Sequence, residues 1–314
     1  MKIIIVDSVH DILIHKLKDK NFDVTYQPEI NESELLKVIS QYDGIIIRSK
    51  LKITSAIIDK ARKLKFIGRV GAGLENIDIK YAENKGIKCF NSPEGNRDAV
   101  GEQALGMLLC LLNNLYRANT EVKHGLWQRE KNRGVELKNK TVGIIGYGNM
   151  GSAFAEKLKG LGCNVIAYDK YKFNFSNEFI REVGLDYLKE ETDILSLHVP
   201  ITEETLYMAN NDFFQSFRKP FYLINTARGP IVKTDEVITN LKNGKILGAA
   251  LDVLEFEKTN FEELYQSETL PSYLKELTEM ENVLLSPHIA GWTNESNRKL
   301  SEIIAIKIIR EYIL

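Results

Sequence analysis

The 314-residue sequence predicts an α/β fold with two doubly wound parallel-sheet domains. Short β-branched runs alternate with longer segments of helical periodicity, which is typical of strand–helix–strand units and parallel sheets. This alternation occurs twice, on either side of a strongly apolar helical segment. The length also exceeds that of one ordinary hydrophobic core and suits two domains.

The first series of elements occupies the first hundred residues. Its expected strands are short, largely apolar runs: Ile3–Val6, Gly44–Arg48, Phe66–Val70 and Lys88–Phe90. Helical periodicity lies between them, including Glu32–Ser40 and Thr54–Ala61. Asn91, Ser92 and Pro93 then interrupt the pattern. We expect a first domain of residues 1–97, completed by residues 292–314, which contain a last helix at about Asn294–Tyr312.

The second series follows an unusually apolar segment. About Ala99–Leu115 is apolar on nearly all sides, which predicts a helix that is buried on most faces. After the polar stretch Lys123–Lys140, six further strands are expected: Thr141–Ile145, Val165–Asp169, Ile194–Val199, Tyr222–Asn225, Ala249–Val253 and Val283–Leu285. We expect a second domain of residues 98–291, and a cleft between the two domains, where small ligands usually bind.

Composition excludes several classes of function. The formal net charge is −1, with 42 basic and 43 acidic residues mixed along the chain, which argues against a nucleic-acid partner. Cys89, Cys110 and Cys163 lack the spacing of disulfide or metal sites, so we expect no metal and a reducing cytoplasm. The start MKIIIVD is typical of a strand, and Leu105–Leu112 is far shorter than the roughly 20 residues that span a bilayer. The composition predicts a soluble protein without a membrane partner.

The most specific local motif lies between the expected strand 141–145 and a helix expected at Ser152–Lys159. It consists of Gly146, Tyr147, Gly148, Asn149, Met150 and Gly151. Glycines at this spacing permit a tight turn and close approach of the backbone to a pyrophosphate, which the helix N-terminus stabilises. A glycine turn that binds nothing is the alternative, but strand, turn and helix in this order argue against it.

An acidic residue follows this motif at the expected distance. Asp169 ends the next strand, 23 residues after Gly146. A carboxylate there binds ribose hydroxyls and repels a 2′-phosphate, which favours NAD over NADP. Lys170 beside it weakens that preference. The sequence therefore predicts an NAD-binding, Rossmann-like second domain.

Candidate catalytic residues follow other strands of the second series. Among five histidines, His10, His15 and His124 fit surface positions, whereas His198 and His288 follow expected strands. Arg228 follows the strand 222–225, and an acidic segment follows the strand 249–253. Carboxyl ends of parallel strands are where ligands bind in such sheets. An arginine, an acid and a histidine can thus converge on a bound nicotinamide.

The ordered motifs resemble the D-isomer-specific 2-hydroxyacid dehydrogenase family over nearly the whole chain. They are GRVGAGLENID at 68–78, GYGNMG at 146–151, LHVPIT at 197–202, INTARG at 224–229, ALDVLEFE at 250–257 and SPHIAG at 286–291. The resemblance implies NAD-dependent interconversion of a D-2-hydroxy acid and its 2-oxo acid. It also implies two Rossmann-like or flavodoxin-like domains: residues 1–97 with 292–314 as the substrate (catalytic) domain, and residues 98–291 as the NAD-binding domain.

The resemblance also implies roles for individual residues. Arg228 would orient the substrate's carboxylate and carbonyl oxygens, and His288 would donate or accept the proton, paired with Glu257. Glu255 remains an alternative to Glu257, because side chains two residues apart on an extended segment face the same way. Asp252 would bind the nicotinamide amide. Further implied cofactor contacts are His198, Val199, Pro200, Thr205, Thr226, Ala227 and Gly291.

Arginines point to the substrate. Arg48, Arg69 and Arg129 match arginines that neutralise a substrate phosphate in phosphoglycerate dehydrogenases, with Arg129 reaching across from a partner subunit. The N–H groups of Val70 and Gly71 could hold the substrate carboxylate. The expected reaction is oxidation of 3-phosphoglycerate to 3-phosphohydroxypyruvate, in serine biosynthesis. A glyoxylate or hydroxypyruvate reductase and a D-lactate-type dehydrogenase are alternatives, in which Arg48 and Arg69 make structural ion pairs.

The resemblance also bears on assembly and regulation. In relatives the helix equivalent to 99–115 packs in a dimer interface, so we expect a homodimer; a helix buried between domains is the alternative. An NAD-sensing, corepressor-like binding protein is the alternative from another functional class. The lack of a disordered tail argues against it. A lid or extra helix is expected within 258–282. We expect no regulatory domain after Leu314, and hence no feedback inhibition by serine through such a domain.

Overall fold

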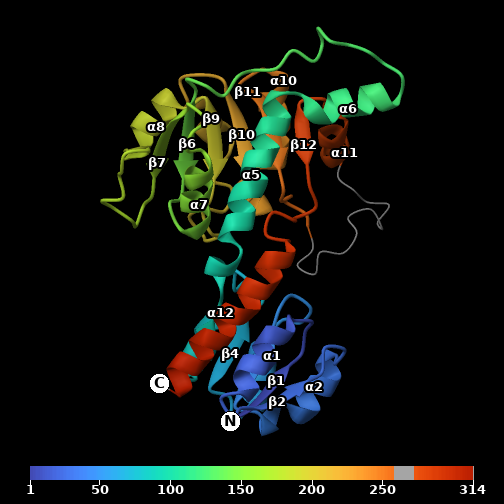
Figure 1. The fold of residues 1–314 in the computed structure, drawn as a ribbon, viewed down its shortest axis with the longest axis vertical. Helices are drawn as coiled ribbons and strands as arrows, with labels where there is room; N and C mark the ends of the chain where they lie inside the picture. Colours follow the sequence, from blue (N-terminus) through green and yellow to red (C-terminus); the bar gives the residue numbers. More distant parts are fainter. Residues whose placement is uncertain (258–271, 314) are drawn as a thin grey trace. The chain divides into compact units, whose positions relative to one another are not determined.

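The computed structural model describes residues 1–257 and 272–313. The chain divides into two compact units, residues 1–97 with 292–314 and residues 98–291 (Figure 1). Each unit is built on one sheet in which every described strand pair is parallel. The predicted fold class, two α/β domains with parallel sheets, is confirmed.

The first unit contains a five-stranded sheet in the order β2-β1-β3-β4-β5. Its strands are β1 (Lys2–Ile5), β2 (Asp23–Tyr26), β3 (Gly44–Ile47), β4 (Phe66–Arg69) and β5 (Lys88–Phe90). Its helices are α1 (Asp11–Lys18), α2 (Glu32–Val38), α3 (Ser55–Lys60), α4 (Ile79–Asn84) and α12 (Asn294–Tyr312), with 3₁₀ turns at Ile39–Gln41 and Pro93–Gly95. The central strands β1 and β3 read KIII and GIII because helices cover both faces of a parallel sheet.

Two apolar clusters hold this unit together. On one face, residues of β1, β3 and β4 pack with α2, α3 and α4. On the other face, α1 and α12 cover the sheet, and Leu300, Ile304 and Ile308 of α12 are buried there. A capping box between Thr293 and Ser296 defines the start of α12. The last helix is therefore part of the core of the first unit.

The second unit contains a seven-stranded sheet in the order β12-β11-β10-β9-β6-β7-β8. Its strands are β6 (Thr141–Ile145), β7 (Asn164–Tyr168), β8 (Ile180–Glu182), β9 (Ile194–Leu197), β10 (Phe221–Asn225), β11 (Ile246–Leu251) and β12 (Val283–Leu285). Helices α5 (Arg97–Leu112) and α7 (Asn149–Lys157) cover one face. Helices α8 (Leu185–Glu191), α9 (Asn211–Gln215), α10 (Thr234–Lys242) and α11 (Ser272–Glu279) cover the other (Figure 1).

The strand order of this sheet reverses beside β6. From β6 the chain proceeds to β7 and β8 on one side, and then to β9, β10, β11 and β12 on the other. In open α/β sheets the crevice at such a switch point, outside the carboxyl ends of the strands, is where ligands bind. The loops that follow β6 and β9 therefore define the expected ligand edge.

Several elements differ from the sequence-based expectation. The strands β2 and β8 were not expected, because each lies at an edge of its sheet and is too short and too polar to stand out. Helix α5 ends at Leu112 rather than Leu115, since Asn114 takes a left-handed backbone (φ 52°) and a separate helix, α6 (Leu115–Lys123), follows. Helix α7 starts three residues earlier than Ser152.

Two further expectations concern a lid or extra helix at 258–282 and the absence of a membrane-spanning helix. Of the expected lid or extra helix at 258–282, residues 258–271 lie outside the described residues, and α11 occupies 272–279. Within the described part of the chain, no helix combines the length and apolar character needed to cross a membrane.

Candidate active site at the carboxyl edge of the seven-stranded sheet

The expected catalytic and cofactor residues follow six neighbouring strands of the second unit. They are His288 after β12, Asp252 and Glu257 after β11, Arg228 after β10, His198 after β9, Gly146 after β6 and Asp169 after β7. Because all these strands are parallel, their carboxyl ends meet at one edge of the sheet. The structure thus places these residues along a single edge, at the switch point of the fold.

The glycine turn after β6 is closely packed on one side and open on the other. Gly146 has a φ of 92°, and a Cβ there would lie 2.5 Å from the carbonyl oxygen of His198. A Cβ on Gly151 would lie 1.9 Å from the carbonyl oxygen of Gly146. A Cβ on Gly148, by contrast, would meet no atom within 4 Å. The backbone at Gly148 is therefore accessible to a ligand.

The start of α7 and the acid after β7 complete this side of the site. Gly148 is the N-cap of α7 and offers no side chain to its first amides, which suits an anion at the helix N-terminus. The Asp169 carboxylate accepts the N–H of Tyr147 (2.7 Å), and also those of Tyr171 (2.9 Å) and Lys172 (3.0 Å). A carboxylate has further lone pairs for ribose hydroxyls. The turn, helix and acid fit a dinucleotide.

Two buried polar atoms at the same edge have no hydrogen-bond partner among the described residues. They are Nδ1 of His198 and Oγ1 of Thr226. Nε2 of His198 lies 2.8 Å from Oγ of Ser196, and burial lowers the pKa of His198 to about 4. The ring is therefore neutral near pH 7. Because unpaired buried polar atoms are costly, both atoms fit a site that a bound cofactor completes.

The loop after β9 has its own internal hydrogen bonds. Oγ1 of Thr205 donates to the carbonyl oxygen of Pro200 (2.6 Å) and accepts the N–H of Thr202 (2.8 Å). Val199 lies beside the glycine turn, since a Cβ on Gly146 would be 2.9 Å from its Cγ1. These contacts fix the loop next to the turn that is expected to bind pyrophosphate.

His288 is paired with Glu257. Nδ1 of His288 lies 3.0 Å from Oε1 of Glu257, and both side chains are partly buried. Such a carboxylate orients the imidazole and stabilises a proton on it. The competing acid, Glu255, instead accepts the N–H of Thr234 at 3.1 Å, at the start of α10. In this structure Glu257, rather than Glu255, therefore lies beside His288, and its catalytic role stays a prediction.

Asp252 anchors the loop that carries His288. Its Oδ1 accepts the hydroxyl of Ser286 (2.5 Å) and the N–H of Ile289 (2.9 Å), and its Oδ2 accepts the N–H of Ala290 (2.8 Å). Its carbonyl oxygen accepts the N–H of His288 (2.7 Å). Burial raises the pKa of Asp252, and the three donors act in the opposite direction.

The backbone of His288 explains why this anchor matters. His288 has a φ of 54°, a left-handed conformation that is uncommon for residues other than glycine. Strained backbone of this kind persists only where surrounding contacts enforce it, and it clusters at functional sites. Sequence reasoning missed this role of Asp252, because its partners lie on another strand and no local pattern indicates the contact.

Arg228 lies on a turn that is fixed from both sides. The side chain of Asn225 accepts the N–H of Ala227 (3.0 Å) and donates to the carbonyl oxygen of Arg228 (3.1 Å). A Cβ on Gly229 would lie 1.9 Å from the carbonyl oxygen of Leu254, so the turn packs directly on the segment after β11. The arginine is thereby held next to the strand that bears Asp252.

In the first unit, Arg48 has an unusual environment. Its guanidinium lies over the ring of Trp292, 4.3 Å from the centroid, and makes no hydrogen bond or ion pair with any other described residue. Burial lowers its pKa. The loop that carries it is held by Asp7, whose Oδ2 accepts the N–H groups of Arg48 (2.9 Å), Ser49 (2.9 Å) and Lys50 (3.0 Å).

The other expected substrate residues are engaged within the first unit. Nε of Arg69 donates to the carbonyl oxygen of Arg48 (3.1 Å), and Nη1 donates to that of Gly73 (2.7 Å). The N–H of Val70 donates to Ile47, and the N–H of Gly71 donates to Arg69, both at 2.9 Å. Both amides are thus hydrogen-bonded within the unit, and their role in holding a substrate carboxylate stays a prediction.

Arg129 of the second unit lies outside the grouping at the sheet edge. It is exposed in the segment between α6 and β6. Nothing in the described part of the second unit brings its side chain to the glycine turn or to His288.

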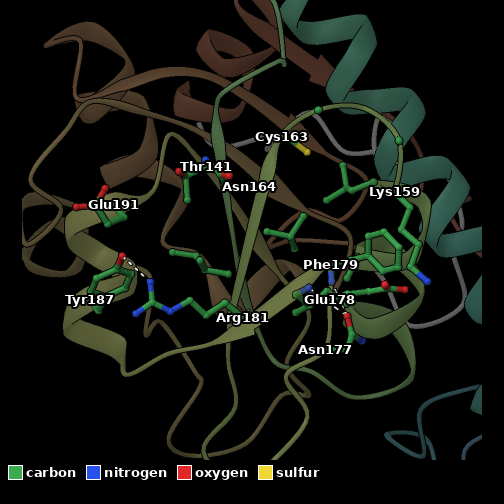
Figure 2. Close-up of a pocket in the computed structure, with 17 residues that line it drawn as sticks. Thr141, Lys159, Cys163, Asn164, Asn177, Glu178, Phe179, Arg181, Tyr187 and Glu191 are labelled. Atoms are coloured by element: carbon green, nitrogen blue, oxygen red, sulfur yellow. Dashed lines mark hydrogen bonds between the residues drawn. The ribbon is translucent and has the colours of Figure 1, made fainter.

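A cavity of about 730 Å³ opens elsewhere in the second unit (Figure 2). Its lining includes Thr141, Asn164 and Ile180, the first residues of β6, β7 and β8. It therefore lies at the amino edge of the sheet, opposite the glycine turn. Nη1 of Arg181 and the hydroxyl of Tyr187 form a 3.0 Å hydrogen bond on one side of it. Its position argues against a role in dinucleotide binding.

Comparison with curated proteins reveals similarity over nearly the whole of this chain. The chain is 34% identical over 295 residues to a hydroxypyruvate reductase from Thermotoga maritima, covering 94% of this chain and 92% of that protein. It is 33% identical over 314 residues to a D-3-phosphoglycerate dehydrogenase from Archaeoglobus fulgidus, covering 98% of this chain. The chain spans only 57% of the length of that second relative.

Solved structures show the same fold. A D-lactate dehydrogenase from Aquifex aeolicus, solved with NAD and lactic acid, is 29% identical, with a TM-score of 0.83 and coverage of 100% of this chain and 95% of that one. A D-2-hydroxyisocaproate dehydrogenase is 28% identical, with a TM-score of 0.83 and coverage of 100% and 97%.

A family model agrees with the position of the glycine turn. Residues 105–290 match the NAD-binding domain of the D-isomer-specific 2-hydroxyacid dehydrogenases. This range contains the turn, Asp169 and every strand of the seven-stranded sheet. The chain belongs to the D-isomer-specific 2-hydroxyacid dehydrogenase family, and NAD is the cofactor of its second unit.

Proposed function

We propose that this protein interconverts a D-2-hydroxy acid and its 2-oxo acid. Residues 98–291 act as the NAD-binding domain, and residues 1–97 with 292–314 as the substrate domain. The observation that carries the proposal is the hydrogen-bonded pair of His288 and Glu257, on the same sheet edge as Arg228 and the glycine turn. Bound NAD supplies or accepts the hydride; the protein supplies position and charge.

Each side chain then has a distinct task. The guanidinium fork of Arg228 suits the carboxylate and carbonyl oxygens of a 2-oxo acid. His288 donates a proton to the carbonyl oxygen during reduction and accepts it from the hydroxyl during oxidation. Glu257 orients the imidazole and stabilises its protonated form. Asp252 fixes the loop so that His288 keeps one pose.

The proposed substrate is 3-phosphoglycerate, which would place the reaction in serine biosynthesis. Arg48 supports this choice, because its guanidinium is partly buried and makes no hydrogen bond or ion pair with a carboxylate among the described residues, the Asp7 carboxylate acting on it only through space. Such a cation is suited to bind a substrate anion. The name of the relative from Archaeoglobus fulgidus agrees with this choice.

A hydroxypyruvate or glyoxylate reductase is the second candidate. Arg69 favours it, because its guanidinium braces the loop at Gly73 and so leaves fewer cations for a phosphate. The relative from Thermotoga maritima, which carries that name, is also matched over 92% of its length.

An assay of the purified protein separates these candidates. NADH absorbance would be followed with 3-phosphoglycerate, hydroxypyruvate, glyoxylate, pyruvate and 2-oxoglutarate. Arg48→Gln should raise KM for 3-phosphoglycerate by at least about tenfold, the value of one charge-assisted hydrogen bond, and change KM for glyoxylate little. Arg62→Gln, which removes an exposed arginine of the same unit, is the matched control.

Two results would contradict the proposal. Equal effects of Arg48→Gln on both substrates would remove the phosphate argument and favour the reductase. NAD binding without turnover of any acid would favour a non-enzymatic, NAD-sensing protein.

We further propose a cytoplasmic homodimer. Five of the exposed apolar side chains of the second unit lie on α6 and the residues directly after it, and none lies on α5: Leu115 (55% exposed), Tyr116 (58%), Val122 (52%), Leu126 (47%) and Trp127 (79%). Exposed apolar patches of this kind mark protein interfaces. Arg129 follows this patch in the sequence, so a dimer formed through the patch would place Arg129 near the partner subunit. The three free cysteines suit a reducing compartment.

Sedimentation tests the homodimer. Leu126→Ser with Trp127→Ser should convert a dimer to a monomer, whereas a monomeric wild-type protein would contradict the proposal.

A further inference from the structure

Lys170 raises a question about cofactor choice. It directly follows Asp169, the acid expected to bind the adenosine ribose. In dinucleotide-binding folds a cation near this position accommodates the 2′-phosphate of NADP. A free ammonium at position 170 would therefore work against the selection of NAD that Asp169 provides.

The structure shows that Lys170 is already bound. Its ammonium forms an ion pair and hydrogen bond with Oε2 of Glu204. The hydroxyl of Tyr171 donates to the same oxygen at 3.2 Å. Pairing raises the pKa of Lys170 and lowers the pKa of Glu204, so both groups are charged near pH 7. Glu204 thus has two partners on one loop.

The pair connects two loops on opposite sides of the glycine turn. Lys170 lies in the loop after β7, and Glu204 lies in the loop after β9. Both strands pair directly with β6, one on each side. The link therefore spans the strand that leads into the turn at Gly146. This places the Glu204 carboxylate on the adenosine side of the cofactor site.

We propose that Glu204 is a cofactor-specificity residue, which engages Lys170 and so denies the 2′-phosphate of NADP its cation. The Glu204 carboxylate also adds a negative charge to that of Asp169, which repels a second phosphate. NAD carries a neutral 2′-hydroxyl, so neither the pairing of Lys170 nor the negative charge of Glu204 affects its binding. The inference rests on NAD being the cofactor of this domain, and it is independent of the substrate.

The exposure of the pair sets the size of the effect. The side chains of Lys170 and Glu204 are 53% and 58% exposed. Exposed ion pairs are weak and salt-sensitive, so a 2′-phosphate can compete for Lys170 but at a disadvantage. Removing the Glu204 charge should tighten NADP binding by roughly fivefold. NAD should remain the preferred cofactor, because Asp169 is unchanged.

The test measures binding rather than turnover. Dissociation constants of NAD⁺ and NADP⁺ would be determined by isothermal titration calorimetry at low salt for the full chain. The variants are Glu204→Gln, the double variant Lys170→Gln/Glu204→Gln, and Glu203→Gln as the matched control. Glu203 is exposed in the same loop, and within the described residues its side chain has no hydrogen bond or ion pair.

We expect Glu204→Gln to tighten NADP⁺ binding and to leave NAD⁺ binding within twofold. The double variant should lose most of the gain, because only the loss of the Glu204 repulsion remains, and Glu203→Gln should show little of it. An unchanged Kd for NADP⁺ in Glu204→Gln overturns the inference. An equal gain in Glu203→Gln, or the full gain retained in the double variant, also overturns it, because the effect would then not pass through Lys170. Absence of NAD⁺ binding in the wild-type protein would instead contradict the cofactor assignment.

Discussion

The loop that carries His288 should depend on one carboxylate. Asp252 accepts three hydrogen bonds from this loop, two at Oδ1 and one at Oδ2. Asp252→Asn keeps the shape of the side chain but replaces one acceptor oxygen with an N–H donor. The new amide can take two orientations. The one that turns its nitrogen toward Ala290 is favoured, because it loses one hydrogen bond, whereas the other orientation would lose two. The N–H of Ala290 is then buried and unpaired.

The magnitude follows from these contacts. One buried donor without a partner costs about 1–3 kcal/mol, and the two remaining bonds lose the strength that a charged acceptor adds. We therefore expect the free energy of unfolding to fall by about 3 kcal/mol. His288 holds a left-handed backbone that itself costs about 1–3 kcal/mol, so a weakened anchor allows the imidazole to move. A misplaced proton donor should lower kcat by about 100-fold.

Urea denaturation and steady-state kinetics check both numbers. Asp19→Asn, at an exposed aspartate of the first unit, is the control for loss of one carboxylate. Calorimetric titration of NAD⁺ separates the anchoring role from a contact with the nicotinamide amide. A variant with wild-type stability and kcat but weaker NAD⁺ binding would refute the anchoring role.

Three further predictions concern neighbouring residues. Glu257→Gln should lower kcat by about 10- to 100-fold and leave the Kd of NAD⁺ unchanged, because it removes the charge beside His288; an unaltered kcat would separate the pair from catalysis. For His198, whose folded-state pKa of about 4 lies below the unfolded value, stability should fall by about 3 kcal/mol as pH drops from about 6.5 to 4. Urea denaturation across this pH range should show a smaller fall in the free energy of unfolding for His198→Gln than for the wild-type protein. Identical pH profiles for the two proteins would contradict the argument that burial lowers the pKa of His198. Gly229→Ala should destabilise the second unit by about 1–3 kcal/mol in thermal melts, since its Cβ would strike the carbonyl of Leu254 and the backbone must shift.

Elements with strong, buried patterns could be predicted from the sequence. The strands β6 and β12 and the helix α12 have the bounds that their apolar patterns indicated. The edge strands β2 and β8 could not be predicted, because their sequences, DVTY and IRE, contain few apolar residues, whereas β12, also an edge strand, reads VLL. The break at Asn114 was equally hidden, since it depends on one backbone angle.

The site was predictable only to the level of strand ends. Sequence order placed Arg228, Asp252 and His288 after successive strands, which parallel pairing brings to one edge. Their hydrogen-bond partners depend on the direction of side chains far apart in the sequence, as the contact of Asp252 with Ile289 illustrates. For Arg69, structural interactions were expected only for the alternative functions, and its partners, the carbonyl oxygens of Arg48 and Gly73, were not indicated by the sequence.

The divided architecture of the first unit has a consequence during synthesis. Its sheet is made from residues 1–97, but one face is covered by α12, which is synthesised only after residues 98–291. At translation rates of about 5–20 residues per second, residues 98–291 take roughly 10–40 s to make. Through that interval Ile3, Ile46 and Phe66 have no helix α12 to cover them. The nascent chain should therefore recruit chaperones to this face, while the intervening domain, continuous in sequence, completes its own folding first.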